Sequence, residues 1–281
     1  GALLNPWFAR DLSLAGRVSY LCPEGQLRVA LVDFRDAIAT IPSLAIHLDR
    51  DANKNREINS QTAILPVLCL LGDEDKVDLR ALLQQRLLIE HPQSEVQQVL
   101  DYELSFYDAQ APSLVGLRHE FIASARLDNL LSCFTGLQAM LDSDGAMSAL
   151  LVCNDHEEVG SLSTSGAQGC LLTSALNRLA GSHSNYAALA ERSLLMSTDN
   201  AHAIHPNFAD RHDDNHGPLL NHGPVIKVNA SQRYATNSET SGLFRMLALM
   251  EDVPVQSFVV RNDMACGSTI GPISAGATGV R

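Results

Sequence analysis

The stretch Ala149-Leu150-Leu151-Val152-Cys153-Asn154-Asp155-His156-Glu157-Glu158-Val159-Gly160-Ser161 contains the residues that decide the fold of this chain. Its first five residues are apolar and predict a buried parallel strand, which ends just before four ionisable side chains. In open α/β sheets the chemistry lies beyond the carboxyl ends of such strands. Two neighbouring glutamates there repel each other unless a cation or a shared proton relieves them. One can then bind a metal while the other takes a proton from a metal-activated water.

A solvated acidic turn is the alternative for an isolated Glu-Glu pair, and two further carboxylates argue against it. Asp128 follows a short extended run and opens a predicted amphipathic helix, where an Asp is also a common helix cap. A second apolar run, 194–198, ends on Asp199 and is followed by His202 and His205. Three strand ends that each bring a carboxylate to one sheet edge predict a site for zinc or manganese.

Six motifs resemble those of the aspartyl aminopeptidases, a family of dinuclear zinc exopeptidases that remove acidic residues from peptide N-termini. The resemblance runs from Trp7 to the last residue, and the motifs occur in the family's order. They are Arg126-Leu127-Asp128-Asn129-Leu130, Asp155-His156-Glu157-Glu158-Val159-Gly160-Ser161, Ser197-Thr198-Asp199-Asn200-Ala201-His202, Gly223-Pro224-Val225-Ile226-Lys227, Arg233-Tyr234-Ala235-Thr236-Asn237 and Cys266-Gly267-Ser268-Thr269-Ile270-Gly271-Pro272.

The resemblance also implies that the chain is an internal part of such an enzyme. Family members begin with a segment that carries a histidine ligand in a His-Thr-Asp-Ser-Pro-like motif, and they end with a Met-His-Ser motif that supplies another. Neither motif occurs in this sequence. We therefore expect the chain alone to bind zinc weakly and to have impaired activity. One local departure from the family pattern is Ala9, where the family has an acidic residue.

The resemblance assigns roles to the four carboxylates. It implies that Asp128 bridges two zinc ions, with manganese or cobalt as the alternative in one position. Glu158 is expected to bind one ion and Asp199 the other, while Glu157 is the general base. A dinuclear site lowers the pKa of its water toward neutrality, and a carboxylate one residue from a ligand lies within reach of that water.

The histidines near these carboxylates are expected to support the site rather than to bind the metals. His202 and His205 have ligand-like spacing, but the family's histidine ligands lie in the two absent motifs. We therefore expect them to orient Asp199 or to structure the turn, and His156 to lie beside the site or to be buried and hydrogen-bonded. Three more histidines, His212, His216 and His222, lie in a predicted loop. A solvated loop near the site explains them at least as well as a direct catalytic role.

Three residues are candidates for substrate binding. Lys227 lies in an apolar strand, where a lysine usually marks the exposed face of an edge strand. The resemblance places it near the pocket for the acidic side chain. Gly267 and Ser268 follow a predicted strand at 258–260 and offer backbone donors for a carboxylate or a tetrahedral oxygen, although glycine-rich turns are common.

His47, in Leu44-Ala45-Ile46-His47-Leu48, has two interpretations. From the residues alone, it is a histidine in an apolar strand with its ring nitrogens satisfied by the backbone. The resemblance implies instead that the insertion domain presents His47 to the active site of the dimer partner. There it would donate a hydrogen bond to the substrate carbonyl or to the developing oxyanion.

Composition limits the class of protein. With 281 residues and 46% hydrophobic content, the chain can bury a core and form two domains. The net charge of −12 argues against nucleic acid. No apolar stretch approaches the roughly 18 residues of a membrane span. Six scattered cysteines without a Cys-x-x-Cys pair indicate a reducing compartment, so we expect a cytoplasmic protein.

The chain divides near residues 110–118. Before this boundary we predict a hairpin of strands 17–22 and 26–32, a helix at 76–90 and a third strand at 99–107. After it, strands are expected to alternate with helices at 168–179, 186–192 and 238–250. The resemblance implies an α/β fold, a zinc-peptidase type sheet with helices on both faces and a β-rich inserted dimerisation domain. Its parts are residues 1–11 at the edge of the catalytic domain, 12–115 as the insertion and 116–281 as the C-terminal part of the catalytic domain.

These features predict a metal-dependent aminopeptidase that releases N-terminal Asp or Glu from peptides and forms a homodimer or a higher homo-oligomer, without nucleic acid or membrane. One alternative is a non-catalytic assembly module that keeps the oligomer surfaces but lacks a complete metal site. Another is a related dinuclear hydrolase with a different terminal-residue specificity.

Overall fold

The computed structural model describes residues 3–73 and 75–281. Its contacts divide the chain into two units, Ala2–Ala125 and Arg126–Arg281. The predicted domain boundary between residues 115 and 116 came from the family resemblance and stays a prediction. Within the described residues, no helix has both the length and the apolar character needed to cross a bilayer.

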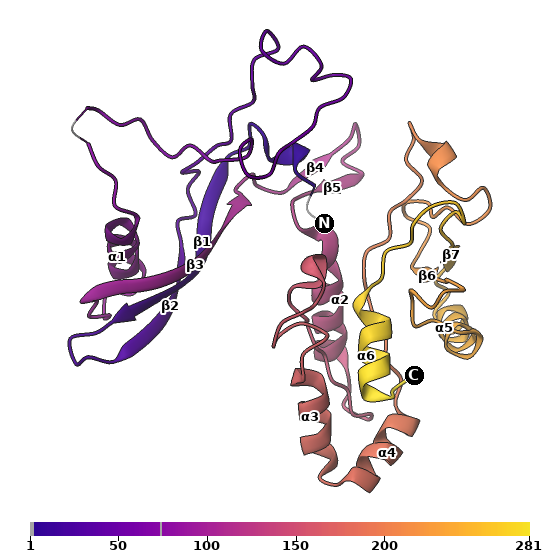
Figure 1. The fold of residues 1–281 in the computed structure, drawn as a ribbon. Coiled ribbons are helices and arrows are strands. Elements are labelled where there is room, and N and C mark those ends of the chain that lie inside the picture. Colours follow the sequence, from indigo (N-terminus) through magenta and orange to yellow (C-terminus); the bar gives the residue numbers. More distant parts are fainter. Residues whose placement is uncertain (1–2, 74) are drawn as a thin grey trace. The chain divides into compact units, whose positions relative to one another are not determined.

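The first unit is built on a three-stranded antiparallel sheet with the order β2-β1-β3 (Figure 1). A short 3-10 helix, η1 (Asn5–Trp7), precedes it. The strands are β1 (Leu12–Leu21), β2 (Leu27–Asp33) and β3 (Gln98–Asp108). β1 and β2 form the predicted hairpin, and Gly25 supplies the left-handed residue of its turn with a φ of 74°. The hairpin and the third strand are therefore confirmed.

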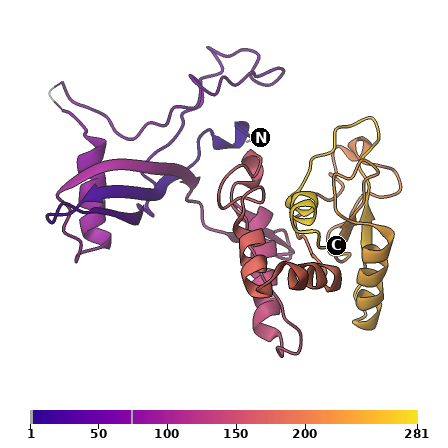
Figure 2. The ribbon, with the colours of Figure 1, turned by 60° about the horizontal axis from the view of Figure 1, so that its bottom comes forward.

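Helix α1 (Leu79–Glu90) covers one face of this sheet (Figures 1 and 2). Asp78 caps its N-terminus by accepting a hydrogen bond from the backbone N–H of Arg80 at 2.9 Å. Leu83 and Leu87 are fully buried against the strands. Each stabilises the fold by about 1.5–3 kcal/mol. The core residues on the strands alternate, as a pleated sheet with one covered face requires: Leu14, Val18, Tyr20, Val32 and Val99.

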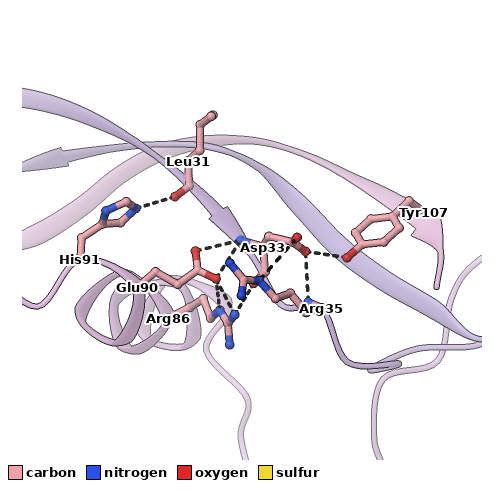
Figure 3. Close-up of polar contacts among 7 residues, drawn as sticks. All are labelled: Leu31, Asp33, Arg35, Arg86, Glu90, His91 and Tyr107. Atoms are coloured by element: carbon pink, nitrogen blue, oxygen red, sulfur yellow. Dashed lines mark hydrogen bonds and ion pairs between the residues drawn. The ribbon is translucent and has the colours of Figure 1, made fainter. Parts of the chain in front are cut away.

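The end of α1 also covers part of the outer edge of β2 (Figure 3). Glu90 accepts a hydrogen bond from the backbone N–H of Asp33 at 3.0 Å, and Arg86 donates to the carbonyl oxygen of Asp33. Arg86 and Glu90 are paired, with 2.7 Å between Nε and Oε1. His91 donates from Nε2 to the carbonyl oxygen of Leu31 at 2.8 Å. An uncovered edge strand would offer these backbone groups to another chain.

The second unit contains most of the helices. A hairpin of β4 (Ser113–Val115) and β5 (Phe121–Ala123) ends the first unit. There follow α2 (Leu127–Asp142), η2 (Glu157–Val159), α3 (Leu171–Ala180), α4 (His183–Arg192), η3 (Ala209–Arg211), β6 (Val225–Lys227), α5 (Ser238–Met250), β7 (Gln256–Phe258) and α6 (Ile270–Thr278). β6 and β7 pair in parallel, and α5 lies beside them, where Arg245 donates to the Ser257 hydroxyl at 2.6 Å (Figure 1). The mixed α/β class and the predicted helices are confirmed.

Two predicted strands of the second unit are wrong. Residues 149–153 and 194–198 form no β-ladder in the described chain. Along both runs, the one backbone hydrogen bond among described residues joins Leu195 to Arg281. Leu150 and Leu194 are 51% and 46% exposed, so these runs are not buried either. Apolar composition predicts burial, whereas a strand also needs a neighbouring backbone at hydrogen-bonding distance.

We expect Glu90→Ala to lower the free energy of unfolding by about 1–3 kcal/mol, because it leaves the Asp33 N–H without an acceptor and removes the carboxylate partner of the half-buried Arg86. Urea unfolding of the whole protein measures this loss. Glu103→Ala is the matched control, since Glu103 pairs with Arg17 at 3.7 Å but is 77% exposed. It should cost less than about 1 kcal/mol. Equal losses in the two variants would contradict a stabilising role for the covered edge.

Candidate active site

A cavity of about 250 Å³ in the second unit is lined by four carboxylates that come from three separate segments. Asp128 lies in the first turn of α2, Glu157 and Glu158 lie in η2, and Asp199 follows the run 194–198. The sequence predicted that these side chains meet, and the structure brings them together. The other residues that line the cavity are Asn200, Ala201, His202, Lys227, Tyr234, Phe258, Gly267, Ser268 and Thr269.

The backbone at the start of α2 is irregular, and this sets the place of Asp128. The residue before the helix, Arg126, has a left-handed φ of 61°, and Asp128 itself has non-helical angles of −83° and 114°. The peptide bond between Asp128 and Asn129 is cis. The N-cap residue of α2 is Arg126, so Asp128 lies inside the first turn and not at the cap position. This corrects the ordinary interpretation of an Asp at a strand-to-helix junction.

A tight turn presents the two neighbouring glutamates. His156 and Gly160 flank η2 with left-handed φ values of 59° and 101°. The turn is closed by a hydrogen bond of 2.8 Å from the Ser161 N–H to the His156 carbonyl oxygen. Because η2 is short and bounded by these two residues, both Glu157 and Glu158 face the cavity instead of alternating as they would in a strand.

The carboxylates perturb one another. Burial raises the pKa of Asp128, and the negative charges of Asp199 and Glu158 raise it further. The pKa of Glu157 is also raised, first by burial and then by Asp199, Glu158 and Asp128. Lys227 acts in the opposite direction on both groups. Such a concentration of anions binds a divalent cation favourably.

Lys227 points into the cavity rather than out from an edge strand. Its Nζ donates to Asp199 Oδ2 and to the Asn200 carbonyl oxygen, both at 2.7 Å. The side chain is only 15% exposed, and Nζ lies 5.8 Å from the centre of the Tyr234 ring. The ordinary interpretation of a solvent-facing lysine is therefore wrong. Lys227 is a cation held on the wall of an acidic cavity.

Buried aromatic rings form the apolar part of the cavity wall. Tyr234 is 9% exposed and Phe258 is 7% exposed. His202 packs edge-on against Phe258, with ring centres 5.1 Å apart. Burial lowers the pKa of His202, and the charges of His212 and Lys227 lower it further. His202 thus lines the cavity in a setting that favours the neutral ring.

The remaining histidines are engaged in local turns. The His205 N–H donates to His212 Nε2 at 3.0 Å, and His205 Nδ1 accepts from the Asn207 N–H at 3.1 Å. His156 Nδ1 lies 2.9 Å from the Ser163 hydroxyl. These contacts lie within the turns that carry the three rings. The hydrogen bonds to Asp199 come instead from two other residues, Asn129 and Lys227.

Asn129 is a site residue to which the sequence alone assigned no role. Its Nδ2 donates to the Thr198 carbonyl oxygen at 3.1 Å and to Asp199 Oδ1 at 3.4 Å. The one feature of the sequence that pointed to a role for Asn129 was its position directly after Asp128. The partner lies 70 residues further along the chain, which no local pattern reveals.

His47 belongs to the first unit and lies in a turn, so the predicted apolar strand around it is wrong. The turn is held by a hydrogen bond of 2.8 Å from the Leu48 N–H to the Ala45 carbonyl oxygen. His47 is exposed, as are Leu44 and Leu48 at 56% and 76%. Proline at position 42 and the lack of a ladder partner explain why this apolar segment is a loop.

Within residues 3–73 and 75–281, no group of three His, Cys, Asp or Glu side chains lies close enough together to hold a metal ion by itself. The carboxylates are nevertheless close enough for their charges to act on one another, since Asp199 and Glu158 raise the pKa of both Asp128 and Glu157. Hard oxygen donors of this kind suit a divalent cation.

The whole chain, residues 1–281, matches the family described as Aminopeptidase I zinc metalloprotease (M18). This chain belongs to the M18 aminopeptidase family. It is 58% identical over 281 residues to the probable M18 family aminopeptidase 2 of Pseudomonas entomophila, and it spans 65% of that protein's length. The chain thus covers a little under two thirds of the curated relatives that it matches.

Solved structures agree on the fold. The chain matches a chain in the cryo-EM structure of the Ape4 and Nbr1 complex with 38% identity and a TM-score of 0.92, covering 100% of this chain and 58% of that one. It matches the S. cerevisiae mApe1 dodecamer with 28% identity and a TM-score of 0.76, covering 100% of this chain and 63% of that one. The predicted zinc-peptidase type of α/β fold is therefore confirmed.

Gly223 lies in the turn that precedes β6, the strand that carries Lys227. Its φ is +87°, and an added Cβ would lie 1.8 Å from the Pro254 carbonyl oxygen. We expect Gly223→Ala to lower the free energy of unfolding by about 3 kcal/mol or more, because the turn before β6 must shift. The matched control is Gly181→Ala, with a φ of +72° but no atom within 4 Å of the added Cβ. It should cost only about 1 kcal/mol of strain. Thermal unfolding compares the two, and equal losses would contradict this account.

Proposed function

We propose that this chain carries the catalytic carboxylates of a zinc aminopeptidase that releases N-terminal Asp or Glu from peptides. The observation that supports this proposal most is the meeting of Asp128, Glu157, Glu158 and Asp199 at one cavity. Membership of the M18 family supplies the reaction class. The acidic specificity, the number of metal ions and the role of each residue are the parts that we propose.

Carboxylate oxygens are donors that zinc accepts, and we assign them to two zinc ions, with manganese or cobalt as the alternative in one position. In this assignment Asp128 would be shared by the two ions, with Glu158 holding one and Asp199 the other, and all three side chains line the cavity. Bound zinc supplies a Lewis acid and lowers the pKa of water toward neutrality. His202, His156 and His205 then support the shape of the site rather than bind the metals.

Glu157 would act as the general base. It lies next to Glu158 in η2 and faces the same cavity. Its raised pKa, caused first by burial, brings it closer to the pH at which a carboxylate can both take and return a proton. In this role Glu157 takes the proton of the attacking water and delivers it to the leaving amine.

The preference for an acidic terminal residue would come from Lys227. It is the lysine on the cavity wall, next to the buried Tyr234 ring. A point cation there favours an Asp or Glu side chain over an apolar one, even though the chain as a whole has a net charge of −12. Gly267 and Ser268 lie on the same wall, just before α6, and would contribute donors to a substrate carboxylate or to the tetrahedral oxygen.

His47 would act on the partner subunit of a homodimer or higher homo-oligomer. Within the described residues its ring has no hydrogen-bond partner, and it lies on an exposed loop with Leu44 and Leu48. An exposed apolar loop of this kind suits an interface between subunits. We also propose a cytoplasmic location, in keeping with six cysteines that are all free thiols.

One assay tests the proposal. The protein, expressed from its complete reading frame, is analysed for zinc per chain and for cleavage of peptides that differ only in an N-terminal Asp, Glu or Leu. We expect zinc to be bound and kcat/KM to be highest for the acidic peptides. Zinc binding with a preference for Leu would indicate a dinuclear aminopeptidase of other specificity. Absence of both zinc and cleavage would refute the enzymatic proposal and favour an assembly module.

The neighbouring glutamates should differ in what they control. We expect Glu157→Gln to lower kcat by about 10²–10⁴-fold with unchanged zinc content, because a general base is lost while the ligands remain. Glu158→Gln should lower zinc content as well, because a ligand oxygen is replaced by an amide. Elemental analysis and peptide hydrolysis on the same samples measure both effects. Equal zinc loss in the two variants would contradict the division of labour.

For His47 we expect a loss of turnover that a second subunit can restore. His47→Ala should lower kcat by about 10²–10³-fold, with zinc content and unfolding temperature unchanged. Mixing it with Glu157→Gln under subunit exchange should recover part of the activity, since a mixed dimer contains one site with both residues intact. Native mass spectrometry verifies the exchange. Verified exchange without recovery would show that His47 acts within its own chain or not at all.

A further inference from the structure

Asn129 connects the first carboxylate segment of the site to the third. It directly follows Asp128, and its Nδ2 donates to the Thr198 carbonyl oxygen at 3.1 Å and to Asp199 Oδ1 at 3.4 Å. One amide thus contacts both the backbone and the side chain of the segment that carries Asp199. The contact therefore joins the residue next to Asp128 to Asp199 itself.

A second hydrogen bond joins the same two segments but contacts no carboxylate. Ser132, one turn along α2, donates from its hydroxyl to Asn200 Oδ1 at 3.4 Å. Asn129 and Ser132 therefore hold the start of α2 against residues 198–200, and only Asn129 reaches a carboxylate.

Asp199 is held on both of its oxygens, by two groups of different charge. Lys227 donates to Oδ2 at 2.7 Å, and Asn129 donates to Oδ1. The lysine neutralises the carboxylate in addition to holding it, whereas the neutral amide fixes its direction and leaves its negative charge in place. The Oδ1 atom of Asn129 is buried and has no hydrogen-bond partner among the described residues, so the amide acts here as a donor only.

We propose that Asn129 is a positioning residue that fixes the distance and direction of Asp199 relative to Asp128, and so sets the metal affinity of the site. The inference rests on the proposed function, because it gives these two carboxylates a shared metal site. Asn129 itself is not a ligand. It acts through the hydrogen bond to Asp199, as residues that orient metal-binding carboxylates do.

The experiment compares three variants of the protein expressed from its complete reading frame. Asn129→Leu keeps the side-chain size and removes the donor. Ser132→Ala removes the neighbouring hydrogen bond between the same segments, and Gln138→Leu removes an amide on the same helix that donates to Asp142 at 2.9 Å, away from the site. Zinc affinity is measured by competition with a chromophoric chelator, and unfolding temperature is measured with and without zinc. Each variant is also assayed with an acidic peptide.

We expect Asn129→Leu to weaken zinc binding by about 10–100-fold, whereas Ser132→Ala and Gln138→Leu bind zinc as the unmodified protein does. The rise in unfolding temperature on adding zinc should shrink in Asn129→Leu alone. A merely structural role would lower the unfolding temperature equally with and without zinc and leave the affinity unchanged, which would overturn the inference.

Two further outcomes separate this inference from the proposed function. If the unmodified protein binds zinc and cleaves acidic peptides while Asn129→Leu keeps full zinc affinity, the function stands and the inference fails. If the unmodified protein binds no zinc, both fail together. Should Asn129→Leu not fold, the smaller Asn129→Ala is measured in its place, and its normal zinc affinity or its failure to fold would likewise overturn the inference.

Discussion

Repulsion among four carboxylates at one cavity is the constraint on which the second unit depends. Asp128 and Glu157 both carry raised pKa values because burial and neighbouring negative charges disfavour their ionised forms. The ammonium of Lys227 and the amide of Asn129 offset this by holding Asp199 from two sides. A structure that brings such groups together must supply either local donors or a bound cation.

The backbone meets this constraint with left-handed residues rather than with regular elements. Arg126 precedes Asp128, and His156 and Gly160 enclose the two glutamates. Non-glycine residues with positive φ are uncommon, and they occur where the surrounding structure holds them against their preference. A regular helix or strand would direct successive side chains to different sides. The irregular turns instead let neighbouring residues share one cavity.

The sequence predicted the helices, the hairpin and the group of carboxylates, because each depends on local periodicity or on a short motif. α5 was predicted with its observed bounds, and its capping box at Asn237 with Thr240 shows why the start was clear. The strands at 149–153 and 194–198 were wrong because an apolar run carries no information on which backbone will pair with it. The role of Asn129 was invisible for a similar reason, since its partner is defined by the fold and lies far along the chain.

The two units are stabilised by different interactions, and this difference explains where function and stability are separable. The hydrophobic core clusters of the described residues both lie in the first unit, around Leu83 with Leu87 and around Leu12 with Ile41. A core of this kind loses stability when one side chain is truncated. The carboxylate cavity is shaped mainly by hydrogen bonds between loops and helix ends, each of which contributes only about 0.5–1.5 kcal/mol to folding. Polar contacts that contribute little to the free energy of folding therefore shape the cavity of this chain, and apolar contacts that contribute more dominate its stability.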